Sequence, residues 1–216
     1  IGTNDNGVNL YDPVSGSFSY FTQENGAIPS NNIKAFLLKA NGNEIYIGSH
    51  GGGLVVFNKN TRKSTAIAIP SDNVYALARD KNNNNNIWIG TLSGLFRYNE
   101  ITQEVFPINT SELNSKQVLF LTIDSKNKLW IGGERSLGMY NLNTNLLTNF
   151  NADDYNGTTS NGAINCIMED SKKNIWFGTR GGICKYEENN KFKSYSKEDG
   201  LSNNSVYGII EDESGK

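Results

Sequence analysis

The sequence is dominated by a short motif that recurs five times at nearly constant spacing. In three copies a tryptophan stands between two apolar residues, and a glycine comes directly after the second of these. A fourth copy has Tyr46 in the tryptophan position, and the chain opens inside a fifth, at Ile1-Gly2-Thr3. The motif glycines are spaced 46, 42, 42 and 46 residues apart, at Gly2, Gly48, Gly90, Gly132 and Gly178. A repeat of this length indicates copies of one small structural unit packed side by side.

Further columns keep the same spacing and define four strand-like segments in each repeat. After each motif comes a glycine or serine, and an aromatic residue stands four positions after it. A third segment then ends, in most copies, near a phenylalanine such as Phe106. A fourth segment is apolar and covers 33–39, 74–80, 118–124, 164–170 and 206–212. It ends in an acid in every copy except the first, which ends at Lys39. Four short strands separated by turn residues, within 42–46 residues, are typical of a propeller blade.

We therefore predict an all-β fold, a β-propeller whose blades are four-stranded antiparallel sheets. The apolar segment that ends in an acid is expected to lie innermost, followed outward by the tryptophan strand, the second aromatic strand and an outer edge strand. The repeats then cover about 1–44, 45–86, 87–128, 129–174 and 175–216. We expect a single propeller segment over 1–216, cut at both ends, because the sequence opens inside a motif and without methionine.

The aromatic columns are predicted to form the core between blades. A blade that is packed between two neighbours buries both faces, which explains why its strands are apolar on both sides. Because an aromatic recurs at the same place in every repeat, packing explains these columns better than a sugar-binding platform does. The expected core residues are Tyr46, Trp88, Trp130 and Trp176 of the motif, and Tyr11, Phe57, Tyr98, Tyr140 and Tyr186 of the following strand.

The pattern Asn-x-Val-x-x-Ile-x-x-Asp, then Ile-Trp-Ile-Gly-Thr, then Gly-Gly-Leu-x-x-Tyr resembles the two-component regulator propeller repeat. It is best seen over 73–98 and 165–186. In that family, two seven-bladed propellers and a small β-sandwich form a periplasmic sensor in hybrid two-component systems of Bacteroidetes. A membrane span, a histidine kinase, a receiver and a DNA-binding region follow, and the usual signals are breakdown products of complex glycans. The resemblance implies a place in a seven-bladed propeller; the rival is a five-bladed ring closed by segment 206–212.

The composition argues against several classes of function. The formal net charge is −2 with both signs interspersed, so no basic stripe is present for nucleic acid. His50 is the only histidine, which is a poor basis for a histidine-based metal or catalytic cluster. The carboxylate pairs 153–154, 187–188 and 198–199 are neighbours in sequence, whereas glycoside hydrolysis needs two acids about 5–10 Å apart across a cleft. We predict no catalytic residue, no metal, no cofactor and no membrane span in this segment.

Ligand binding is predicted where the repeats differ most, in the loops between the second and third strands. In a propeller these loops share one face with the blade-to-blade connections and surround the central funnel. Arginine suits anionic or hydroxyl-rich sugar fragments because its guanidinium donates bidentate, charge-assisted hydrogen bonds. The alternative is that these are solvated loop charges. The predicted ligand-binding residues are Asn4, Asp5, His50, Glu134, Arg135 and Arg180.

The resemblance implies a ligand-sensing propeller segment of a periplasmic sensor in a hybrid histidine kinase, which responds to glycan breakdown products and signals to transcription. The expected partners are an oligosaccharide and the remaining propeller and sensor domains of the parent chain, and homodimerisation stays open. Kinase activity would reside in domains outside this segment. Two alternatives remain: a scaffold for protein–protein interaction without a small ligand, and a carbohydrate-active propeller enzyme.

Overall fold

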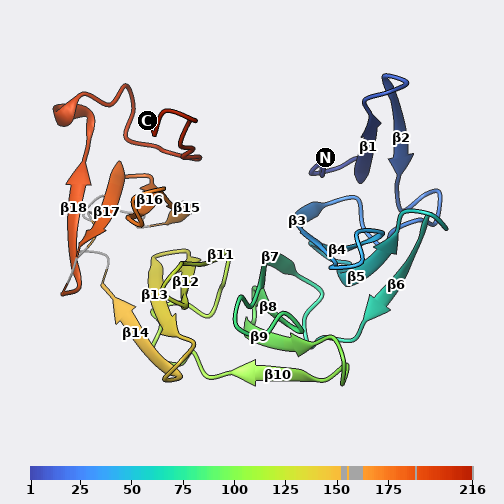
Figure 1. Ribbon diagram of the computed structural model, residues 1–216, viewed down its shortest axis with the longest axis horizontal. Coiled ribbons are helices and arrows are strands. Elements are labelled where there is room, and N and C mark those ends of the chain that lie inside the picture. Colours follow the sequence, from blue (N-terminus) through green and yellow to red (C-terminus); the bar gives the residue numbers. More distant parts are fainter. Residues whose placement is uncertain (152–154, 156–162, 188, 216) are drawn as a thin grey trace.

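The computed structural model, which describes residues 1–151, 155, 163–187 and 189–215, is an open arc of β-sheets (Figure 1). In the described residues, four sheets have four strands each and a further sheet, at the N-terminal end, has two. Every strand pair is antiparallel, and the strands of a sheet are adjacent in the order of the chain. The predicted all-β propeller fold with four-stranded blades is confirmed.

We number the sheets as blades I to V along the chain. Blade I consists of β1 (Val8–Asp12) and β2 (Ser17–Phe21). Blade II consists of β3 (Ile33–Leu38), β4 (Glu44–Ser49), β5 (Gly53–Asn58) and β6 (Lys63–Ile67). Blade III consists of β7 (Val74–Arg79), β8 (Asn86–Thr91), β9 (Gly94–Asn99) and β10 (Val105–Ile108).

The last two complete blades follow the same order. Blade IV consists of β11 (Phe120–Ile123), β12 (Lys128–Gly133), β13 (Ser136–Asn141) and β14 (Leu146–Phe150). Blade V consists of β15 (Ile164–Glu169), β16 (Ile175–Thr179), β17 (Ile183–Glu187) and β18 (Lys191–Tyr195), and a short 3₁₀ helix, η2 (Lys197–Asp199), comes after it. As predicted, the first strand of each four-stranded blade lies on the inside of the arc and the fourth on the outside (Figure 1).

The segment 206–212, expected to be an inner strand, forms no strand in the described structure. Its first residue is placed like an inner strand, because Val206 N–H donates to the carbonyl of Thr179 at 2.8 Å. In the described part of the chain, however, no strand follows it with which it could pair. The two ends of the chain lie on opposite sides of the opening of the arc (Figure 1), and no pairing of 206–212 with blade I occurs among the described residues. Closure into a five-bladed ring is therefore not observed.

The motif glycines are required by the close packing of one blade on the next. A Cβ atom added at Gly48 or Gly90 would lie 2.6 Å from the side chain of Val74 or Val118, respectively. Real Cβ atoms essentially never approach another heavy atom this closely. Both valines open the inner segment of the following blade, so any larger residue in the motif would push two blades apart.

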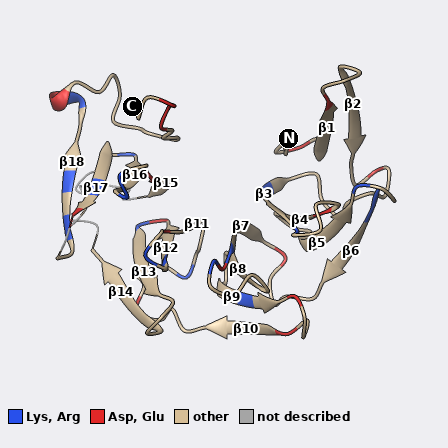
Figure 2. Ribbon diagram, in the orientation of Figure 1, with Lys and Arg blue, Asp and Glu red and all other residues tan. Residues whose placement is uncertain are grey.

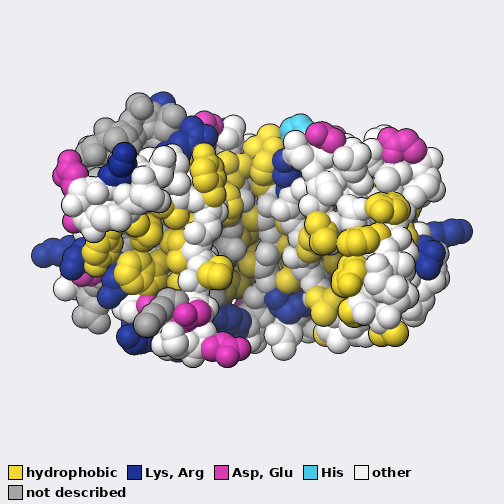
Figure 3. All heavy atoms as spheres, turned by 90° about the horizontal axis from the view of Figure 1, so that it is seen from above, with side chains coloured by type: hydrophobic (Ala, Val, Ile, Leu, Met, Phe, Trp, Pro, Cys, Tyr) yellow, Lys and Arg dark blue, Asp and Glu magenta, His cyan; other side chains and the backbone are white. Residues whose placement is uncertain are grey.

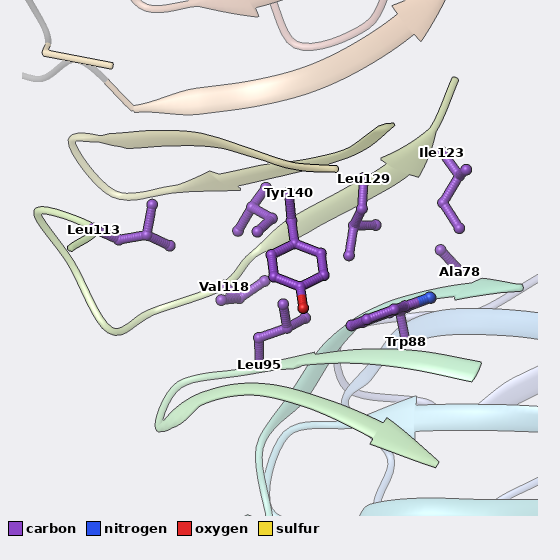
Figure 4. Close-up of a cluster of buried hydrophobic side chains, with 9 residues drawn as sticks. Ala78, Trp88, Leu95, Leu113, Val118, Ile123, Leu129 and Tyr140 are labelled. Carbon is purple, nitrogen blue, oxygen red and sulfur yellow. The ribbon is translucent and has the colours of Figure 1, made fainter. Parts of the chain in front are cut away.

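The aromatic residue of the second strand packs against the aromatic of the third strand in the following blade. Figure 4 shows this arrangement between blades III and IV, where Trp88 faces Tyr140 among Leu95, Val118 and Leu129. The ring centroids of the three such pairs are 6.4, 5.6 and 4.9 Å apart for Tyr46–Tyr98, Trp88–Tyr140 and Trp130–Tyr186. Blade-to-blade contact is thus made by the same two aromatic columns along the arc.

Two residues predicted for the core, Tyr11 and Trp176, are not buried at the ends of the arc, and a third, Tyr186, is partly buried against Trp130. Tyr11 of blade I is 48% exposed, and Trp176 of blade V is only half-buried. Both occupy the expected repeat positions, but each lies in a blade at one end of the arc, where no described blade covers it. Figure 3 looks into the open side of the arc and shows hydrophobic side chains on both arms.

The acid that ends the inner strand supports the tryptophan of its own blade. The indole Nε1–H groups of Trp130 and Trp176 donate to carboxylate oxygens of Asp124 and Asp170 at 2.9 and 2.8 Å. The other oxygen of Asp124 accepts backbone N–H groups of the turn to β12, so one buried carboxylate joins the turn to the core. Blade II has neither the acid nor the tryptophan.

In blade II the substitutions at these two positions compensate each other. Lys39 stands where the other blades have the acid, and its Nζ lies 5.6 Å from the ring centroid of Tyr46. A cation over an aromatic face replaces the hydrogen bond between carboxylate and indole. The Tyr46 hydroxyl donates instead to Glu100 of blade III, at 2.7 Å. At these two positions, an acid that accepts a hydrogen bond from tryptophan is therefore replaced in blade II by a lysine that lies over tyrosine.

The Asp170 carboxylate is expected to make the stability of the fold depend on acid pH. Burial opposes its charge, but hydrogen bonds from the Trp176 indole and from Asn174 outweigh burial and hold the pKa of Asp170 below its usual 3.8. The pKa of Asp170 is lower in the folded than in the unfolded chain, so its carboxylate stabilises the fold at pH values above its usual pKa. This contribution is lost as the pH falls through the pKa of the folded state.

Substitution of Asp170 by Asn should therefore reduce the loss of stability that wild type shows as the pH falls below about 4. Urea denaturation followed by circular dichroism at a series of acid pH values measures the free energy of unfolding, and its dependence on pH gives the slope to compare. Substitution of the exposed Asp72 by Asn removes one carboxylate without such a site and is the control. Equal slopes for the Asp170 and Asp72 variants would contradict the prediction.

Candidate ligand-binding cleft

A cleft of about 330 Å³ lies on the inner side of the arc, against the inner strands of blades II to V. Its polar residues are Lys34 of β3, Tyr75 of β7, Asn165 of β15, and Glu134 and Arg180 in the loops after β12 and β16. Its apolar surface comes from Leu119, Phe120, Ala163 and Ile164. The cleft is thus assembled by residues from four successive blades.

Three of the polar residues occupy the same position in their strands, at a β-bulge. The pairing of the inner strand with the second strand shifts between residues 33 and 35, 74 and 76, and 164 and 166. The residues skipped by the pairing are Lys34, Tyr75 and Asn165. A bulge leaves one residue outside the ladder and can redirect its side chain, which is how these three come to line the cleft.

A chain of contacts connects the cleft to the loops of blades I and II. Lys34 Nζ donates to Asn4 Oδ1 at 2.8 Å and lies 5.5 Å from the centroid of the Tyr75 ring. The Tyr75 hydroxyl is 3.1 Å from Nδ1 of His50, and the two rings meet edge to face. Asn4 and His50 thus hold cleft residues in place without lining the cleft themselves.

The structure brings four of the six predicted ligand-binding residues into or next to this cleft. Glu134 and Arg180 line it, and Asn4 and His50 contact residues that line it. Asp5 and Arg135 are exposed and do not line it.

Of the two neighbouring loop residues Glu134 and Arg135, only Glu134 accompanies Arg180 at the cleft. Arg135 occupies the second position of a two-residue turn between β12 and β13, with a left-handed φ of 58°. Successive residues of such a tight turn project in different directions, so only one of the two reaches the cleft.

Sequence reasoning missed Lys34, Tyr75 and Asn165 because it looked for variation in loops. The signal was nevertheless present inside a strand. The position directly after the first apolar residue of the inner segment holds four different residue types in the five repeats, while its neighbours stay apolar or small. The five residues in this column are Lys34, Tyr75, Leu119, Asn165 and Tyr207.

Of the carboxylate pairs singled out in the sequence, the structure describes only Glu187, Glu198 and Asp199. Asp153, Asp154 and Glu188 lie outside the described residues. Asp199 caps η2, because its carboxylate accepts hydrogen bonds from the backbone and side chain of Ser196. Within the ranges that the structure describes, no group of three His, Cys, Asp or Glu side chains could hold a metal ion. Among the described helices, none has the length and apolar character needed to cross a membrane.

Comparison with known proteins agrees with the repeat pattern and the blades. A family model described as "Two component regulator propeller" matches residues 159–181. Residues 159–181 are thus similar to the repeat of that family. Histidine kinase P4 of Formosa agariphila is 28% identical to this propeller chain over 265 residues, which cover 94% of the chain and 19% of the kinase. The propeller chain therefore spans about a fifth of the length of that relative.

Solved structures confirm the propeller fold of this chain. The extracellular domain of the putative hybrid two component system BT3049 from B. thetaiotaomicron superposes with a TM-score of 0.80 at 19% identity, covering 99% of this chain and 29% of that one. Virginiamycin B lyase from Staphylococcus aureus superposes with a TM-score of 0.65 at 14% identity, covering 87% of this chain and 61% of the lyase. The likeness to both is one of fold. The predicted resemblance to regulator propellers is confirmed.

Proposed function

We propose that this regulator propeller chain is the ligand-sensing part of a hybrid two-component histidine kinase on the periplasmic side of the inner membrane. In this proposal the cleft binds an oligosaccharide released from a complex glycan, and the parent chain passes the signal to transcription. The sequence relationship to a histidine kinase and the fold shared with an extracellular two-component domain support the setting. Kinase chemistry would come from domains outside these 216 residues.

The observation that carries the proposal is the convergence of variable residues from four blades on one cleft. Blade packing uses the glycine and aromatic columns, whereas the cleft uses the bulge column and the loops after the second strands. A surface whose residues differ from blade to blade, on a repeated scaffold, is typical of a binding site.

The chemistry of the cleft suits a sugar. Arg180 and Lys34 supply cationic donors for hydroxyl or carboxylate oxygens, and Glu134 supplies an acceptor for hydroxyl groups. Phe120 and Tyr75 supply aromatic surface for the apolar face of a sugar ring.

The proposal includes further blades. Tyr11 of blade I and Trp176 of blade V are partly exposed, and their counterparts in the middle of the arc pack against a neighbouring blade. Additional blades of a seven-bladed ring would cover these surfaces and enclose the cleft.

Combined substitution of Lys34 and Arg180 by alanine is expected to weaken oligosaccharide binding about tenfold or more, because two charge-assisted donors are lost. Calorimetric titration of the intact sensor region with short neutral and acidic oligosaccharides measures the affinity. The control is Arg135→Ala, which removes a loop arginine that does not line the cleft and should leave the affinity within about twofold. Unchanged affinity in a folded Lys34/Arg180 variant would reject the cleft as the site.

A further inference from the structure

A second groove, of about 430 Å³, lies between blades IV and V. It is bounded by the turn from β11 to β12, the turn from β15 to β16, and the end of β17. In antiparallel blades these turns are at the opposite end of the strands from the loops after β12 and β16 that border the ligand-binding cleft. The groove is therefore on the other face of the arc and is separate from that cleft.

Lysine dominates the charge of this groove. Five lysines line it, against three acids, and Figure 2 shows cationic residues around blades IV and V. The acids are Asp124, Glu169 and Glu187. The lysines are Lys126, Lys128, Lys172, Lys173 and Lys185.

Two of the three acids are already engaged by other groups. Asp124 accepts the Trp130 indole and two backbone N–H groups, as described above. The Glu169 carboxylate accepts the backbone N–H of Ser125 at 3.0 Å and its hydroxyl at 2.5 Å. In the described part of the chain the only ion pairs within 4.0 Å are Lys39–Glu44 and Arg79–Glu100, so none of the five groove lysines is paired.

The groove between blades II and III has a similar place in the repeat but a balanced set of charges, with two lysines and two acids. It has a volume of about 400 Å³ and is lined by Lys39, Glu44, Tyr46 and Glu100, among others. Here the Lys39 ammonium lies 3.1 Å from the Glu44 carboxylate, and the Arg79 guanidinium lies 2.5 Å from that of Glu100. Both acids of this groove are thus in ion pairs, whereas the five lysines of the groove between blades IV and V are in none.

Two of the lysines are held over aromatic rings, which restricts where their charges can lie. Lys128 Nζ is 5.9 Å from the ring centroid of Tyr186, and Lys185 Nζ is 5.6 Å from that of Trp176. Both lysines are partly buried on strands, whereas Lys126, Lys172 and Lys173 project from the turns. Two ammonium groups held over aromatic rings, together with three exposed ones in the turns, form a surface that complements several negative charges on one ligand.

We propose that the groove between blades IV and V binds a short oligoanion, a molecule that carries sulfate, phosphate or carboxylate groups at several positions along a chain. Each group would accept hydrogen bonds from one or two lysine ammonium groups. Because the groove shares no residue with the sugar cleft, this inference stands independently of the proposed sensing function.

Titration of the 216-residue chain with sodium tripolyphosphate, a trisulfated disaccharide and tri-glutamate tests the proposal and distinguishes the three sources of charge. We expect at least one probe to bind, with an affinity that falls as NaCl is raised, because salt screens exposed charges. Lys128→Gln combined with Lys185→Gln should weaken this binding about tenfold, since two charge-assisted hydrogen bonds are removed.

The matched control is Lys39→Gln combined with Lys63→Gln, which removes the same number of charges from the groove between blades II and III and should leave binding within about twofold. If the Lys128/Lys185 variant unfolds, Lys126→Gln with Lys172→Gln, both in exposed turns, provides the same test. Absence of binding by all three probes overturns the proposal. So does an equal loss in the groove and control variants, which would indicate attraction to net charge alone.

Discussion

Replacing Trp130 by alanine is expected to lower the free energy of unfolding by about 3–5 kcal/mol, the cost of truncating a large buried aromatic side chain. Trp130 is fully buried between blades IV and V. Its ring centroid lies 4.9 Å from that of Tyr186 and 5.3 Å from that of Phe177. The substitution also leaves the buried Asp124 carboxylate without its indole donor, which adds to the cost of the cavity.

The repeat provides a matched control at Trp176, which occupies the same strand position and donates to the corresponding acid of its own blade, Asp170, but is only half-buried. Trp176→Ala should therefore cost clearly less than Trp130→Ala, since less apolar surface returns to water. Urea denaturation followed by far-ultraviolet circular dichroism measures both values without relying on tryptophan emission. Equal costs at the two positions would show that burial between blades is not the source of the effect.

Replacing Gly182 by alanine should have an effect of similar size for a backbone reason. Gly182 has a φ of +137°, and an added Cβ would lie 2.0 Å from the carbonyl oxygen of Tyr195. The methyl group would meet main chain, which cannot move aside as a flexible side chain can, so β17 and β18 would have to separate. The expected cost combines about 1–3 kcal/mol of backbone strain with about 1–3 kcal/mol of steric conflict.

Gly94 starts the corresponding strand of blade III and separates the cost of backbone strain from the cost of steric conflict. Its φ is +144°, but an added Cβ would meet no atom within 4 Å. Gly94→Ala should therefore show the backbone strain alone and be less destabilising than Gly182→Ala by about 1–3 kcal/mol. Thermal and urea unfolding of the two variants measure the difference, and a larger loss for the Gly94 variant would refute the steric argument.

The blade architecture could be predicted because the features that hold blades together repeat in the sequence. The motif glycines and both aromatic columns have the same neighbours in successive blades, so a regular pattern in the sequence becomes a regular pattern of contacts. Trp176 and Tyr11 differ because burial depends on a second blade that the column itself does not provide. Periodicity therefore predicts where a residue lies within its blade and not whether another blade covers it.

The candidate cleft was only partly predictable, for the opposite reason. Glu134 and Arg180 could be predicted because they stand in loops whose variation is visible in the sequence. Lys34 and Tyr75 stand inside strands, and only the shift in pairing at a bulge explains why they face the cleft. Nothing in the local sequence separates a bulged residue from an ordinary variable strand residue, since the bulge is defined by the partner strand.

The bulge column has a consequence for how such a scaffold can change its ligand. Lys34, Tyr75 and Asn165 are skipped by the strand pairing, and none of them belongs to the aromatic or glycine columns on which blades stack. Substitutions there would alter the cleft and a few polar contacts between blades, such as Lys34–Asn4 and Tyr75–His50, but would leave the ladder and the aromatic and glycine contacts intact. In the proposed sensor, recognition and folding would thereby depend on largely separate sets of residues, so new specificities could accumulate one residue at a time with little loss of stability.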